Sequence, residues 1–193
     1  VIRPPKNEAW FPADFQIIWS ATDTASGIAR VNGPSSVSQE GRGLGFIGRA
    51  EDRVGNQGQE SVSVNLDKTA PLVNAGLDFN AMEGSTANFS GLVSDNLDES
   101  PVFAWSFGDG SGTEQAASPG HIYVENGSYT AVLVSTDHAG HSASDSIIVG
   151  VLNAAPIIAV IQDKSAKEGD SIAVSASFTD PGVLDTHTAE LDW

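Results

Sequence analysis

The feature that most constrains the fold is an internal repeat with a period of about 85 residues. Ala70-Pro71 recurs as Ala155-Pro156, and Glu83-Gly84 recurs as Glu168-Gly169, both at an offset of 85 residues. The further matches at this offset are Asp78 with Asp163, Ser90 with Ser175, and Asp95 with Asp180. A repeat of this size is typical of tandem domains that fold as separate units.

The repeat divides the chain into three predicted domains. Residues 71–153 hold one complete copy, residues 154–193 hold the first half of a second, truncated copy, and residues 1–70 differ from both. We expect the first strand of the domain at 1–70 to lie upstream of Val1. The chain begins with Val and has no secretion-signal pattern, so we expect a processed chain or a piece of a longer one.

Short apolar runs separated by turn residues predict strands and no long helix. Val62, Val64 and Leu66 alternate with polar residues, as do Phe103 and Trp105 further along the chain. The predicted strands cover residues 15–20, 43–50, 59–66, 86–93, 102–107, 128–135 and 142–151. Several short strands spaced by turns within each unit favour an all-β fold of immunoglobulin-like β-sandwiches in an extended tandem array.

The composition excludes several classes of function. With 25 acidic against 9 basic residues, the net charge is −16, so a phosphate backbone or an anionic membrane surface would be repelled. The absence of Cys excludes disulfides and thiolate chemistry. No apolar run approaches 18 residues, so we expect no membrane insertion.

The sequence also argues against an enzyme. It has no Gly-x-Ser-x-Gly nucleophile motif. His138 and His141 have a His-x-x-His spacing, but no helix or nearby Glu supports a metal site there. A small sandwich offers no deep cleft. We therefore expect no catalytic residues.

A group of acidic residues makes calcium the best candidate for a bound cofactor. Asp95, Asn96 and Asp98 fall in one predicted loop. In an immunoglobulin-like sandwich this loop shares one end with the last hairpin, which carries Asp137, and with the chain entry at Asp67. Calcium prefers such clustered oxygen ligands. The alternative interpretation is that these side chains are solvated loop residues, and the absence of an Asp-x-Asp-x-Asp-Gly pattern supports it.

Several spaced motifs within residues 71–153 resemble the PKD (polycystic kidney disease) domain family. They are Trp105-Ser-Phe107-Gly-Asp-Gly110, His121-Ile-Tyr123, Gly127-Ser-Tyr129 and Asp137-x-x-Gly140. The resemblance implies a β-sandwich of immunoglobulin-like topology. Residues 156–193 are similar to the first half of another PKD repeat.

Residues 1–70 resemble bacterial immunoglobulin-like repeats of secreted proteins. The motifs that carry the resemblance are Ser26-Gly27-Ile28 and Ala50-x-Asp52-x-x-Gly55-Asn56. Both families imply a secreted, extracellular or cell-surface protein assembled from several domains. Neighbouring domains of the same polypeptide are then the expected partners.

The PKD-like motifs also make local structural predictions. Gly108-Asp109-Gly110 follows an apolar strand and predicts a tight turn, with a positive φ at a glycine and a backbone hydrogen bond to Asp109. We expect Tyr129 to place its ring in the core and its hydroxyl on nearby backbone. We expect His121 to satisfy a local backbone group.

These observations support a non-catalytic stalk or spacer that positions other domains. Pro71 and Pro156 end short predicted linkers, which they would stiffen. The alternative is a module for adhesion, or for polysaccharide or protein binding in a secreted hydrolase. Such modules expose aromatic side chains. Trp10 and Phe11, which lie outside any clear predicted strand, are the candidate ligand-binding residues, although packing at a domain edge is the competing interpretation.

Overall fold

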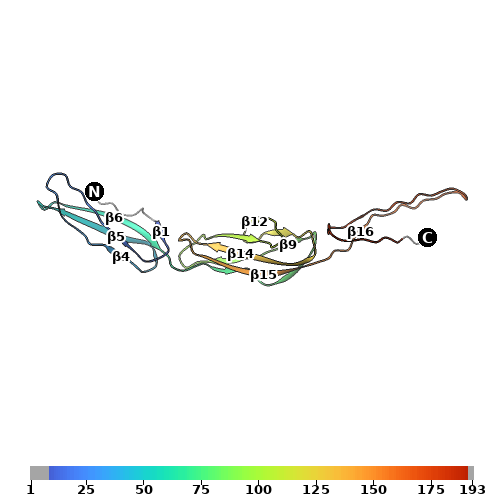
Figure 1. Cartoon of the computed structure of the whole chain (residues 1–193), viewed down its shortest axis with the longest axis horizontal. Coiled ribbons are helices and arrows are strands. Elements are labelled where there is room, and N and C mark those ends of the chain that lie inside the picture. The colour runs from blue at the N-terminus through green and yellow to red at the C-terminus, as the bar shows by residue number, and fades with distance from the viewer. Residues whose placement is uncertain (1–8, 191–193) are drawn as a thin grey trace. The chain divides into compact units, whose positions relative to one another are not determined.

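The computed structural model describes residues 9–190 and is all-β (Figure 1). No helix occurs among these residues, and so none that could cross a membrane. The predicted fold class, an all-β protein, is confirmed. By their internal contacts, residues 1–73, 93–103 and 134–144 form one compact unit, and residues 74–92, 104–133 and 145–193 form another.

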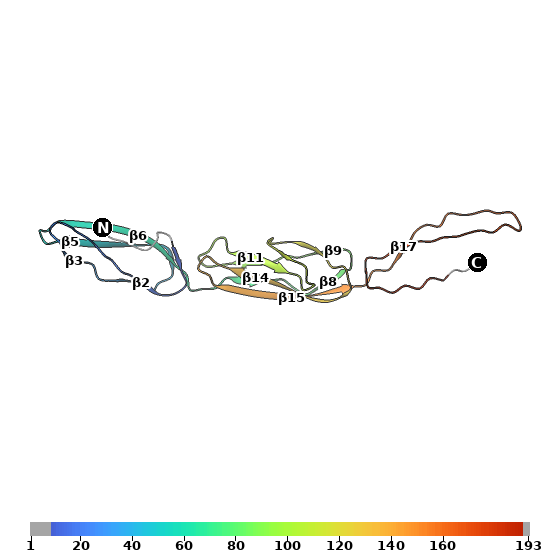
Figure 2. The same cartoon turned by 45° about the horizontal axis from the view of Figure 1, so that its top comes forward.

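The first unit contains a four-stranded sheet and a two-stranded sheet. The long strands β5 and β6 form an antiparallel hairpin, with β1 added parallel to β6 and β3 antiparallel to β5 (Figure 2). The strands of this sheet are β1 (Ala9–Phe11), β3 (Ile28–Val31), β5 (Gly41–Asp52) and β6 (Gln57–Leu66). The second sheet pairs β2 (Phe15–Ile17) with β4 (Ser35–Val37).

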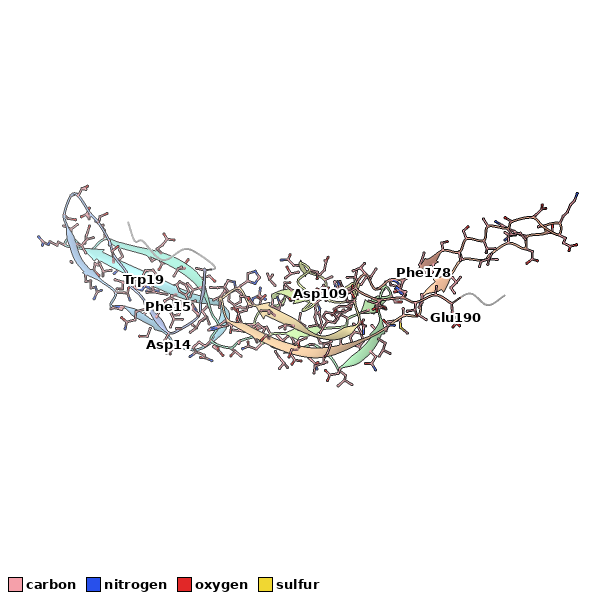
Figure 3. The ribbon with its side chains drawn as sticks, turned by 45° about the vertical axis from the view of Figure 1, so that its right-hand side comes forward. Asp14, Phe15, Trp19, Asp109, Phe178 and Glu190 are labelled. Carbon is pink, nitrogen blue, oxygen red and sulfur yellow. The ribbon has the colours of Figure 1, made fainter. Side chains whose placement is uncertain are left out.

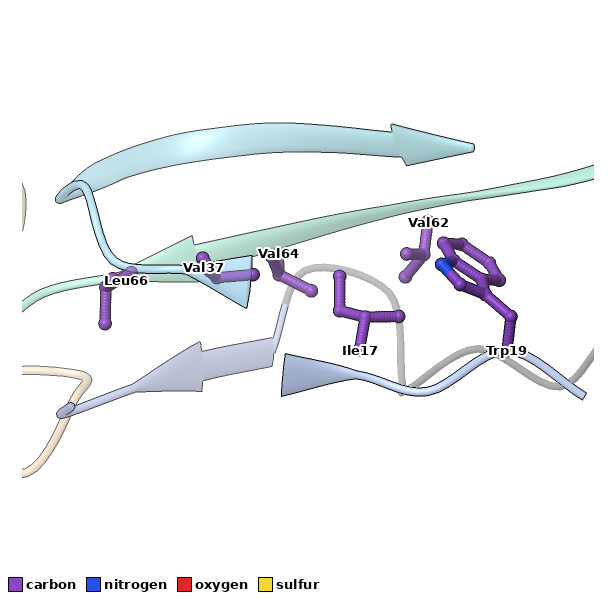
Figure 4. Close-up of a cluster of buried hydrophobic side chains, with 6 residues drawn as sticks. All are labelled: Ile17, Trp19, Val37, Val62, Val64 and Leu66. Carbon is purple, nitrogen blue, oxygen red and sulfur yellow. The ribbon is translucent and has the colours of Figure 1, made fainter. Parts of the chain in front are cut away.

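The two sheets of the first unit enclose an aliphatic core around one indole ring (Figure 4). Its fully buried members are Ile17, Trp19, Val37, Val62, Val64 and Leu66. The face of 59–66 predicted to point inward is therefore the buried one. Gly48 leaves room for the ring, because a Cβ at this position would lie 2.0 Å from Cε3 of Trp19.

A five-stranded sheet follows, in the order β12-β11-β14-β15-β8. Its strands are β8 (Phe79–Met82), β11 (Val102–Ser106), β12 (Thr113–Glu114), β14 (Gly127–Thr136) and β15 (Ser142–Leu152). Two small sheets pair β7 (Leu72–Asn74) with β10 (Leu92–Ser94), and β9 (Thr86–Asn88) with β13 (Gly120–Ile122).

The core of the second unit is built on aromatic rings. Phe89 contacts Trp105 at 5.1 Å and Phe107 at 5.0 Å between ring centroids, and all three are buried. Phe107 and Trp105 occupy the predicted inward positions. The strand predicted at 86–93 is split into β9 and β10, because the N–H groups of Phe89 and Gly91 donate to loop carbonyls at Pro119 and Ala117.

Residues 154–190 contain little regular structure. Only β16 (Ile157–Ile158) and β17 (Phe178–Thr179) are strands among these described residues, and they pair antiparallel. Many apolar side chains here are exposed, including Val160, Ile172 and Val174. The assignment of 154–193 as half of a sandwich remains a prediction.

Candidate functional site

Asp67 lies directly after β6 and is fully buried. Its backbone N–H donates to the carbonyl of Phe11 at 3.0 Å, which fixes the point where the chain leaves the sheet. Its Oδ1 accepts the N–H of Thr69 at 3.0 Å. Its Oδ2 is buried and has no hydrogen-bond partner.

Asp95 and Asp137 have the same pattern. Oδ1 of Asp95 accepts two backbone N–H groups of its own loop, from Leu97 at 2.9 Å and from Asp98 at 2.7 Å. Oδ1 of Asp137 accepts the N–H of Gly140 at 2.6 Å and that of His141 at 2.8 Å in the turn after β14. In both residues Oδ2 is buried without a partner.

The three carboxylates converge on one point. One oxygen from each of Asp67, Asp95 and Asp137 lies within 4.8 Å of the others; we call these residues the Asp67 cluster. Burial raises the pKa of Asp67, and the negative charges of Asp95 and Asp137 raise it further. Buried like charges without donors are costly, and a hard cation with oxygen ligands would relieve this cost. The donor set, all carboxylate oxygen, fits calcium.

The structure does not bring every predicted ligand to this cluster. Asn96 is exposed. Asp98 is buried, but its oxygens are already engaged: Oδ1 accepts Ser100 N–H at 2.9 Å, and Oδ2 accepts the backbone N–H of His138 at 2.9 Å and meets its Nδ1 at 2.6 Å. Burial alone would raise the pKa of Asp98, but these hydrogen bonds outweigh it and lower the pKa.

Trp10 and Phe11 are strand residues, which corrects the expectation that they lie outside a strand. They belong to β1 and pair with Asn65 and Leu66 of β6. Phe11 stacks on Phe15 at 3.9 Å and packs against the core, so it is not available as a flat binding surface.

Trp10 is half-buried and lies at the side of a recess. The guanidinium of Arg42 lies 5.7 Å from the centre of its ring, and His138 stacks on it at 6.0 Å. The recess is lined by Trp10, Arg42, Gly43, Ser63 and Asn65.

Glutamates of two Glu-Gly pairs hold the segments on either side of the complete repeat, a role that sequence reasoning missed. Glu40 accepts the N–H of Lys68 and the hydroxyl of Thr69. Glu83 accepts the N–H of Ala154 at 2.8 Å. Ala154 stands 85 positions after Thr69, so both glutamates grip the same place in successive segments. The recurrence of Glu-Gly was the available signal.

The Gly-Asp-Gly turn forms as predicted, but its partner is different. Gly108 has a φ of 81°, and Oδ1 of Asp109 accepts the N–H of Ser111 at 3.0 Å. His121 does not satisfy backbone, which corrects our expectation. Its Nε2 meets Oδ2 of Asp109 at 2.7 Å, and its ring stacks on Phe107 at 4.0 Å, because this face of the ring is covered by the core.

The hydroxyl of Tyr129 donates to the carbonyl of Glu125 at 3.0 Å, the backbone contact that the sequence predicted. The ring is half-buried and stacks on Tyr123 at 4.5 Å. The hydroxyl of Tyr123 in turn donates to the carbonyl of Phe107 at 3.0 Å. Two tyrosines therefore tie the strand ends to the core.

Comparison with solved structures finds chains built of cadherin or immunoglobulin domains. Cadherin domains 1–4 of protocadherin gamma B7 share 14% identity at a TM-score of 0.35, over 93% of this chain and 60% of that chain. Domains 1–4 of Drosophila N-cadherin share 16% at 0.35, over 92% and 58%. The eight N-terminal Ig domains of Down syndrome cell adhesion molecule share 18% at 0.37, over 96% and 28%. The chain thus spans 60% or less of each of these structures.

Comparison with curated proteins gives no match. Among protein families, the model of the PKD domain matches residues 68–151. The match covers the complete repeat and leaves out residues 1–67, for which the resemblance to bacterial immunoglobulin-like repeats remains a prediction. Residues 68–151 therefore form a PKD domain.

Proposed function

We propose that this chain is a non-catalytic spacer segment of an extracellular or cell-surface protein, in which sandwich domains follow one another in series and position other domains. The observation that carries the proposal is the Asp67 cluster. Asp67 belongs to the segment that leaves β6, whereas Asp95 and Asp137 lie in loops of the PKD domain. Three buried oxygens without donors at that place favour a device that stiffens the connection.

Calcium is the ion we assign to the Asp67 cluster. It accepts six to eight oxygen ligands at about 2.3–2.6 Å. The three free Oδ2 atoms would supply part of the shell, and water the rest. The bound ion would neutralise the mutual repulsion and hold residues 67–71 against the two loops. Glu40, which already grips Lys68 and Thr69, would support the same segment.

Thermal melting of the full chain in calcium and in chelator tests this proposal. If calcium at about a hundredfold excess over its Kd binds only the folded state, it adds about 2.7 kcal/mol to the free energy of unfolding. We expect Asp95→Asn to remove this gain. Asp163→Asn, at an exposed acidic position elsewhere, is the matched control and should keep it.

The variant should also behave differently without metal. Because like charges raise the pKa of Asp67, Asp95→Asn relieves repulsion and should raise the melting temperature in chelator. Equal melting of the wild type with and without calcium, together with no heat of binding in calorimetry, would remove the calcium assignment.

Small-angle X-ray scattering of the full chain tests the spacer role itself. Domains in series predict an elongated particle whose maximum dimension is well above that of a 193-residue globule, for which the radius of gyration is about 16 Å. We expect calcium to narrow the distribution of dimensions. A compact particle would contradict the spacer role even if calcium binds.

A glycan- or protein-binding role is the second candidate, and the recess beside Trp10 favours it. A half-buried indole next to a guanidinium and amide groups is a common surface for polar ligands. Retention on insoluble polysaccharides or immobilised matrix proteins, lost in Trp10→Ala and kept in Phe178→Ala, would support it. Equal retention of both variants would exclude the Trp10 recess as the binding surface.

A further inference from the structure

A second cluster of metal-ligating side chains lies at the position that the repeat predicts. Asp180 is the counterpart of Asp95 at the offset of 85 residues. One donor atom each from Asp180, Asp185 and His187 lies within 4.8 Å of the others; we call these three residues the Asp180 cluster. They come from one loop after β17.

Asp180 organises this loop. Its Oδ1 accepts the N–H of Gly182 at 2.9 Å, and its Oδ2 meets Nε2 of His187 at 3.0 Å. The side chain of Asp180 is only 4% exposed, whereas that of His187 is 24% exposed. The cluster therefore has a buried side and a side open to solvent.

Glu83 supplies an independent indication of a ligand. It is 1% exposed, and its Oε1 accepts the N–H of Ala154 at 2.8 Å, while its Oε2 is buried without a partner. It faces the Asp180 cluster across Gly182: a Cβ built there would lie 3.2 Å from Oε1 of Glu83 and 2.8 Å from Oδ2 of Asp185. A buried carboxylate oxygen without a donor requires a cation or a proton.

The electrostatics of the loop agree with this arrangement. Burial raises the pKa of Asp185, and the charges of Glu83, Asp180 and Glu125 raise it further. The hydrogen bond from His187 lowers the pKa of Asp180. Negative charge thus accumulates around Asp185 more than one imidazole relieves.

We propose that the Asp180 cluster, backed by Glu83, binds a divalent transition-metal ion of the zinc class. The imidazole sets this site apart from the Asp67 cluster, which offers oxygen alone. Nitrogen ligands suit zinc, whereas calcium takes oxygen ligands. Zinc bonds of about 2.0–2.2 Å place neighbouring donor atoms roughly 3 Å apart, which matches the 3.0 Å between Asp180 and His187.

Calorimetric titration of zinc chloride into the full chain, with calcium present in excess, tests the proposal. We expect one zinc ion to bind, and Asp185→Asn and His187→Gln each to weaken its affinity at least about tenfold. Both changes lie at positions that are not fully buried, and unchanged melting temperatures without metal would show that the variants fold.

His138→Gln and His141→Gln are the matched controls, because these histidines form the other pair that could attract zinc. We expect both variants, and Asp95→Asn, to bind zinc as the wild type does. Zinc binding that is absent, that survives His187→Gln and Asp185→Asn unchanged, or that is lost in a control variant would overturn the proposal. None of these outcomes bears on the calcium assignment, which Asp95→Asn tests by itself.

Discussion

The complete and the partial copies of the repeat place equivalent residues in opposite environments. Ala87 and Phe89 of the complete copy are 2% and 3% exposed. Their counterparts at the offset of 85 residues, Ile172 and Val174, are 47% and 40% exposed. Equivalent apolar positions therefore do not suffice for burial.

The difference is explained by what covers the inward face. In the complete copy, Trp105 of β11, Leu133 of β14 and Val149 of β15 are buried in the same core. Among the described residues of 154–190, only the two-residue strands β16 and β17 pair with each other. Phe178 of β17 is accordingly 49% exposed (Figure 3). The first half of the repeat specifies an apolar face, and the second half buries it.

Truncating the same position in both copies would break or confirm this contrast most strongly. Phe89→Ala leaves a cavity among aromatic rings and should lower the free energy of unfolding by about 3–5 kcal/mol. Val174→Ala, at a largely exposed position, should change it by less than about 1 kcal/mol. Urea denaturation followed by tryptophan fluorescence measures both, and comparable losses would show that residue 174 is packed in solution.

The contrast also shows what the sequence can predict. Alternation located the long strands correctly, because Val62, Val64 and Leu66 repeat with the period of a strand and are buried. It did not predict the break after β9, which depends on hydrogen bonds from Phe89 to the distant loop at Pro119. Periodicity carries no information about such non-local partners.

The candidate site was partly predictable for the same reason. Asp67, Asp95 and Asp137 were grouped because the topology of a sandwich puts their loops at one end. Asp98 was grouped with them by proximity in sequence, yet its side chain turns to His138. The choice of partner depends on side-chain direction, which loop composition does not encode. The buried role of Glu83 could be found only as a recurring Glu-Gly pair.

The Gly-Asp-Gly turn sharpens the comparison, since only the complete copy contains it within the described chain. A Cβ at Gly108 would lie 2.4 Å from the carbonyl oxygen of Thr130 in β14, at a φ of 81°. Gly108→Ala should therefore cost about 3 kcal/mol, from strain and from displacement of β14.

Gly110→Ala is the matched control for that change. Gly110 has nearly the same φ, 82°, but no atom lies within 4 Å of its Cβ position. Its cost should be limited to the backbone conformation, about 1 kcal/mol. Equal losses in the two variants, measured by urea denaturation, would mean that the approach of the turn to β14 contributes nothing to the stability of the complete copy.

An Asp–His pair occurs in each copy, and acid titration should separate them. In the complete copy burial would raise the pKa of Asp109, but hydrogen bonds from Ser111 and His121 lower it to about 2. A carboxylate whose pKa is lower in the folded state stabilises the fold above its unfolded value, near 3.8. This contribution, about 2 kcal/mol, disappears as the pH falls through 2.

The difference in unfolding free energy between wild type and Asp109→Asn should therefore be largest above pH 4 and shrink toward zero at pH 2. Asp180→Asn should show a smaller dependence, because the loop around Asp180 and His187 supports no packed core, whereas His121 is stacked between Asp109 and Phe107. Urea denaturation at stepped pH gives both curves. A pH-independent difference for Asp109→Asn would show that the hydrogen bonds of its turn act through geometry alone, and that the two copies do not differ in how strongly an Asp–His pair is coupled to folding.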